Sequence, residues 1–125
     1  MLQAYSLNVE AAAGAAYPLT SVRLQKGQSV VINGTSTIQF NKCGVYMLEC
    51  DASAAAAITI QAMQNGVLLP FAQSTGTSPS FMTLIQVSDN NTQCPCSSPT
   101  TVQIVNSGTA PATATNLNVV VTKIC

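Results

Sequence analysis

Cysteine is the residue type in this chain with the widest choice of chemistry. The chain has five, namely Cys43, Cys50, Cys94, Cys96 and Cys125. Cysteines pair as disulfides, bind metal ions as thiolates, or stay reduced as small core residues. Two lie in the segment NKCGVYMLEC (41–50) and two in QCPCS (93–97), and neither spacing decides between these roles. The choice depends on where the fold places each thiol.

The residue types that catalysis usually needs are scarce. The chain contains no histidine and only four acidic residues. Histidine is the commonest general base, activates serine and cysteine nucleophiles, and is a frequent zinc ligand. We therefore expect no enzymatic activity, no catalytic residues and no cofactor.

Charged side chains are few and evenly balanced, with four of each sign. Binding to nucleic acid and electrostatic attachment to a membrane both require clustered lysine and arginine, and no cluster is present. The N-terminal segment has polar residues where a secretory signal needs a continuous apolar core, and no stretch has the length of a membrane span. We expect no nucleic-acid or membrane partner, and synthesis in a bacterial cytoplasm without export by the usual route.

Apolar and polar residues alternate along several segments with the period of two that is typical of β-strands. These segments are 37–40, 57–63, 101–105 and 116–124. The segment 81–87 is apolar on both faces, and turn-forming sequences separate the segments. The pattern predicts a single all-β domain over residues 1–125, an antiparallel two-sheet sandwich of about eight strands. Within it, about residues 1–19 form an N-terminal arm or a first strand.

The order of these segments resembles the jelly-roll domain of the tumour necrosis factor and complement globular-head superfamily. Phe40, Gly44 and Tyr46 at the start of the third strand carry the resemblance, together with the hairpin sequence Asn65-Gly66. Glycine suits a close approach of backbones, Asn-Gly favours a type I′ turn, and we interpret Tyr46 as a core aromatic with a paired hydroxyl. The resemblance covers about residues 20–125. It is closest to bacterial and phage members, including the C-terminal domains of collagen-like spore-surface glycoproteins.

The resemblance also implies where the cysteines lie. In that jelly roll, the strand near 43–50 pairs with the last strand on one side and with the strand near 80–88 on the other, both antiparallel. A candidate disulfide cluster then gathers at one end of the sandwich, made of Cys43, Cys94, Cys96 and Cys125. Three states stay open for these four: disulfides, reduced thiols, or a zinc site, for which the C-P-C spacing is unusually tight.

Cys50 has a different expected role. It lies about 23 Å along an extended strand from Cys43, at about 3.3 Å per residue. Bridged Cα atoms lie within about 7 Å of each other, so a straight strand excludes a Cys43–Cys50 disulfide. We interpret Cys50 as a small buried hydrophobic residue.

Members of the superfamily are characteristically homotrimers, and one segment of this chain fits that expectation. Phe81, Met82, Leu84, Ile85 and Val87 form a candidate trimer-interface strand. A two-sheet sandwich covers only one face of each strand, so a second apolar face needs another cover. A partner subunit or a long loop would supply it.

Three contexts fit such a trimer. We favour a structural protein of a bacteriophage virion, either a capsid decoration (cement) protein or a head fibre, with the major capsid protein or another virion component as partner; the receptor-binding tip of a phage fibre is an alternative. The second context is a bacterial spore or cell surface, where a collagen-like stalk is expected. A cytokine-like or complement-like ligand ranks last. The chain has no tryptophan and few acidic residues, which favours decoration over a tip that grips sugar.

Overall fold

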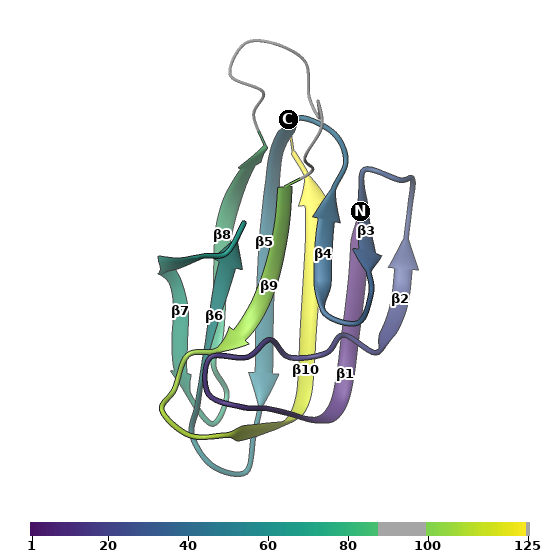
Figure 1. Ribbon diagram of the computed structural model, residues 1–125. Coiled ribbons are helices and arrows are strands. Elements are labelled where there is room, and N and C mark those ends of the chain that lie inside the picture. Colours follow the sequence, from purple (N-terminus) through teal and green to yellow (C-terminus); the bar gives the residue numbers. More distant parts are fainter. Residues whose placement is uncertain (88–99, 125) are drawn as a thin grey trace.

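The computed structural model describes residues 1–87 and 100–124 (Figure 1). These residues form ten strands and no helix. The strands are β1 (Leu2–Ala11), β2 (Ser21–Gln25), β3 (Val30–Asn33), β4 (Thr37–Phe40), β5 (Gly44–Ser53), β6 (Ile58–Gln64), β7 (Val67–Gly76), β8 (Ser80–Val87), β9 (Thr100–Asn106) and β10 (Ala112–Lys123). None of the described residues lies in a helix that could cross a lipid bilayer.

The strands form two antiparallel five-stranded sheets. Sheet A has the order β2-β1-β10-β5-β8, and sheet B has the order β3-β4-β9-β6-β7. Figure 1 shows the two sheets as layers of a sandwich. The predicted antiparallel sandwich is therefore confirmed, with two strands more than expected.

The core lies between the two sheets because each strand directs alternate side chains inward. On β5 the inward row is Tyr46, Leu48, Cys50 and Ala52, and all four are buried. The largest fully buried side chains also include Phe40, Ile38, Ile60, Ile104 and Leu117.

The expected neighbours of the third strand are confirmed. Strand β5 pairs with β10 from Ser53–Asn116 to Tyr46–Lys123, and with β8 from Gly44–Val87 to Asp51–Ser80. Both pairings are antiparallel, so the start of β5 lies beside the ends of β8 and β10.

The N-terminal residues are part of the sandwich. Strand β1 lies between β2 and β10 in sheet A. Of the two forms expected for the N-terminal segment, an arm or a first strand, Leu2–Ala11 has the form of a first strand. The segment that follows β1 is also anchored, because the Tyr17 N–H donates to the Ile104 carbonyl over 2.8 Å and Tyr17 is fully buried. Residues 1–19 therefore pack within the sandwich and do not form an arm that extends to a capsid.

The Asn65-Gly66 sequence makes the tight turn between β6 and β7. Asn65 has a φ of 51° and Gly66 a φ of 83°, as a type I′ turn requires at both central positions. The Asn65 side-chain oxygen also accepts a hydrogen bond from the Thr101 N–H over 2.9 Å. The hairpin therefore fixes the register of β6 and β7 and is tied to the start of β9.

Candidate assembly surface

Cys43 lies directly before β5, at the end of the sandwich where β8 and β10 finish. It takes part in a disulfide. Val87 pairs with Gly44, and the Ile124 N–H donates to the Val45 carbonyl over 2.8 Å. The chain therefore passes close to Cys43 where it leaves β8 and where it leaves β10. Cys94, Cys96 and Cys125 lie outside the described residues, so the four-cysteine cluster stays a prediction.

Cys50 is free and fully buried on the inward row of β5, as expected. Burial, and to a lesser degree the Asp51 carboxylate, raises the pKa of the Cys50 thiol. A thiol in such surroundings stays protonated and is a poor nucleophile. Within residues 1–87 and 100–124, no three His, Cys, Asp or Glu side chains gather as metal ligands would.

Alkylation by iodoacetamide tests the burial of Cys50. We expect no alkylation of Cys50 in the native protein at pH 8, and complete alkylation after unfolding in urea without reductant. Peptide mapping by mass spectrometry measures both states. Rapid alkylation of Cys50 in the native protein would contradict the buried placement.

Tyr46 anchors the start of β5. Its ring meets the Phe40 ring edge-on, with centroids 4.8 Å apart and an interplanar angle of 72°. Its hydroxyl donates to the Lys42 carbonyl over 2.7 Å, and burial raises the pKa of this hydroxyl. The interpretation of Tyr46 as a core aromatic with a paired hydroxyl is confirmed. Phe40 and Tyr46 thus join sheet B to sheet A at this end.

The outer face of sheet A carries apolar side chains that no described part of the chain covers. On β8 they are Met82, 60% exposed, and Leu84, 58% exposed. Register places Leu84 beside Met47 of β5, and Met82 beside Glu49. On the other side of Glu49 lies Val120 of β10. We call this surface the sheet A face.

The candidate interface strand divides between two faces. Ile85 and Val87 point inward and are buried in the core, and Phe81 is partly buried against the core. Only Met82 and Leu84 point outward and remain available to a partner. Of the five residues named for the candidate interface strand, the inner sheet-to-sheet packing uses three, and the second apolar face that needs a cover consists of the other two.

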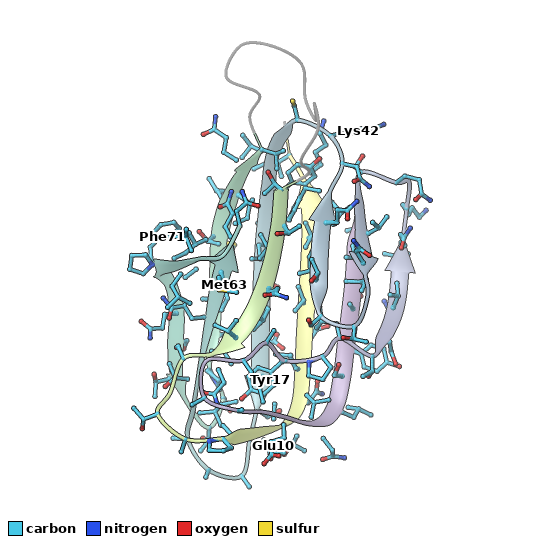
Figure 2. The ribbon with its side chains drawn as sticks, viewed as in Figure 1. Glu10, Tyr17, Lys42, Met63 and Phe71 are labelled. Carbon is cyan, nitrogen blue, oxygen red and sulfur yellow. The ribbon has the colours of Figure 1, made fainter. Side chains whose placement is uncertain are left out.

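A second apolar surface lies at the edge of the sandwich formed by β7. Val67, Leu68 and Phe71 are exposed there, and Phe71 is 67% exposed. Figure 2 shows Phe71 projecting away from the body of the protein. The pairing of β6 with β7 shifts between Gln61 and Met63, and the Gln61 amide donates to the Leu69 carbonyl over 3.0 Å. Phe71 lies on the exposed side of this irregular stretch of β7. We call this surface the β7 edge.

The two edge strands on this side differ in how they protect their backbones. Strand β7 contains Pro70 and the register shift, both of which hinder pairing with another strand. Strand β8 pairs with β5 without a shift and contains no charge and no proline. A regular, uncharged edge with exposed Met82 and Leu84 is the kind that another chain usually covers.

Hollows at the opposite end of the sandwich offer no catalytic groups. Two of them, of about 250 and 300 Å³, lie between the β5–β6 and β9–β10 connections. Their walls are Ala, Thr, Gly, Pro, Ile and Asn residues, with no acidic, basic or thiol side chain among them. They suggest no reaction.

Comparison with known protein families finds no match, and comparison with curated protein sequences finds none either. Solved structures do match. Murine APRIL superposes with a TM-score of 0.63 over 98% of both chains at 8% identity. Rabbit GITRL superposes with a TM-score of 0.55 over 94% of both chains at 10% identity. The globular domain of zebrafish complement 1qA protein superposes less well, with a TM-score of 0.48 at 12% identity.

APRIL and GITRL are of the tumour necrosis factor family. At these identities the likeness concerns the fold alone. The predicted jelly roll of the tumour necrosis factor type is thus confirmed, whereas its bacterial and phage branch stays a prediction.

Proposed function

We propose that this chain is a non-enzymatic structural protein that assembles as a homotrimer. The observation that carries the proposal is the presence on one protomer of two different apolar surfaces that no described residue covers, the sheet A face and the β7 edge. A trimer is also what the resemblance to the tumour necrosis factor and complement superfamily implies.

The arrangement of the two surfaces favours a ring. A two-fold dimer brings one patch against the same patch of its partner, whereas two different patches that fit each other join head to tail and form a ring when the rotation between copies closes. The β7 edge of one copy would lie on the sheet A face of the next. In a ring of three copies, the neighbouring copy would also cover the regular edge of β8.

Charged side chains on the sheet A face are few. On the sheet A face the described acidic residues near Met82 and Leu84 are Glu49 and Asp51, and β8 itself carries no charge. Fully burying one large apolar side chain contributes about 1.5–3 kcal/mol. Several exposed side chains per protomer can therefore offset the loss of freedom on association, about 4 kcal/mol at the lower end.

Within this class, we place the protein on a bacteriophage virion as a capsid decoration protein or head fibre, made in the host cytoplasm. Its partner is the major capsid protein or another virion component. A nearly uncharged polar surface suits a stable coat, and the four acidic residues and absent histidine leave little for catalysis. A fibre tip and a spore or cell surface are the alternative settings.

Co-sedimentation tests this setting. We expect the genes beside the coding sequence to include a major capsid protein, and the purified chain to sediment with empty shells assembled from that protein. It should not bind the unassembled capsid subunits, because decoration sites form only in the lattice. Adjacent tail genes together with no shell binding would point to a fibre tip. If neither capsid genes nor tail genes lie beside the coding sequence, the virion setting is contradicted.

A further inference from the structure

The outer face of sheet B is free of formal charge. None of its five strands contains Asp, Glu, Lys or Arg. The charged residues of the described chain lie on sheet A strands, as Glu10, Arg23, Glu49, Asp51 and Lys123, or in connections, as Lys26 and Lys42. The face presents amides and hydroxyls instead, from Thr37, Gln39, Thr101 and Gln103 among others.

Hydrogen bonds fix several of these amides in a row. The Asn33 amide donates to the Gln39 side-chain oxygen over 2.8 Å, and the Gln39 amide donates to the Asn41 side-chain oxygen over 2.8 Å. The Asn41 amide in turn donates to the Gln28 carbonyl over 2.9 Å. One strand further on, the Gln103 amide donates to the Thr37 hydroxyl over 3.1 Å. We call these residues, with Thr101 between them, the amide row.

The amide row keeps unused hydrogen-bonding groups. A carboxamide has two N–H donors and an oxygen with two lone pairs. Gln39 and Asn41 each use one donor in the row, and Gln103 donates to Ser36 and Thr37 and leaves its own oxygen open. An unused donor on Gln39 and an unused oxygen on Gln103 therefore remain on β4 and β9. Because these amide side chains are already held in place, binding a ligand costs less side-chain entropy than binding to mobile amides would.

The amide row remains accessible in the assembly proposed above. It lies on the outer face of sheet B near β3 and β4, while the sheet A face belongs to the other layer and the β7 edge to the opposite side of sheet B. Trimer formation would leave three copies of the row facing solvent.

We propose that the amide row is a docking surface for neutral carbohydrate. Sugar hydroxyls both donate and accept hydrogen bonds, so they can bond the unused donors and acceptors of these amides. A charge-free face has no attraction for anionic polymers and pays no cost for leaving a charge unpaired. No aromatic side chain lies in the row, so each site binds weakly, and three sites on one trimer raise the avidity for a polymer.

Protein-observed NMR tests the docking surface with dextran, mannan and neutral N-acetylated oligosaccharides as probes. We expect at least one of them to shift the side-chain amide signals of Gln39, Asn41 and Gln103, with little change at 0.5 M NaCl. Heparin and polygalacturonate, which are anionic, should shift none of the three. Because this measurement uses the wild-type protein, it does not depend on any variant folding.

Matched variants locate the site. Gln39→Ala and Gln103→Ala should each weaken binding about tenfold, the effect of losing a hydrogen bond. Asn116→Ala removes an exposed amide from β10 in the opposite layer, sheet A, and should leave binding unchanged. Absence of shifts with every neutral probe, shifts with the anionic polymers only, or equal binding by all three variants would each overturn the proposal. The short N-acetylated oligosaccharides engage one row at a time, so their result does not depend on the oligomeric state and the proposed trimer is tested separately.

Discussion

Leu84→Asp is expected to convert the assembled protein into monomers of 12.9 kDa that keep the native fold. Leu84 is 58% exposed on the outer side of β8, so a carboxylate there stays hydrated in the isolated protomer. In the assembly the same carboxylate would be buried near the Glu49 carboxylate and without a cationic partner. Removing such a charge from water costs several kcal/mol, enough to weaken association more than a hundredfold. Size exclusion with light scattering measures the mass, and circular dichroism checks the strands.

The control is a charge of the same kind on a surface that the assembly leaves open. Thr35→Asp places a carboxylate in the exposed turn between β3 and β4, away from the sheet A face and the β7 edge, and should leave the mass unchanged. Loss of assembly in both variants would mean that added charge alone disrupts the protein. An unchanged mass for Leu84→Asp would remove β8 from the interface.

Tyr46→Ala is expected to lower the free energy of unfolding by about 3–5 kcal/mol, as the loss of a buried aromatic usually does. Tyr46 is fully buried, packs edge-on against Phe40 and bonds the Lys42 carbonyl through its hydroxyl. The substitution therefore leaves a cavity between the two sheets and an unpaired carbonyl near Cys43. Urea unfolding followed by circular dichroism measures the change.

Tyr46→Phe is the matched variant, because it keeps the ring and removes only the hydroxyl. We expect it to cost about 1 kcal/mol, the usual contribution of one hydrogen bond. Both variants are best measured in the Leu84→Asp background, where unfolding is not coupled to association. Equal losses for the two substitutions would show that the hydroxyl, and not the ring packing, is what matters at this position.

Alternation and turn sequences in this chain predict much of the fold. The segment 37–40 is strand β4 with the expected bounds, and Asn65-Gly66 makes the expected turn. Sequence alternation indicates strand β7 only poorly, because Pro70 and the register shift opposite Gln61 interrupt its pattern. Strand β1 has Ser6 on its inward row and Asn8 with a φ of 54°, so its apolar period is broken too.

The surfaces depend on information that a linear sequence does not contain. The sequence of β8 shows that both faces are apolar, but only packing against sheet B shows that Ile85 and Val87 belong to the core. The amide row joins Asn33, Gln39 and Gln103 from three strands, and their adjacency follows from register. The length of the strand between Cys43 and Cys50 already predicts that these two cysteines do not pair with each other. In the structure Cys43 takes part in a disulfide, and Cys50 is free in the core.

The mass of the wild-type protein in solution tests the central claim most directly. Size exclusion coupled to light scattering should report three times 12.9 kDa at micromolar concentration, with no dependence on salt up to 0.5 M because the proposed contacts are apolar. A mass of 12.9 kDa across that range would contradict the proposed assembly.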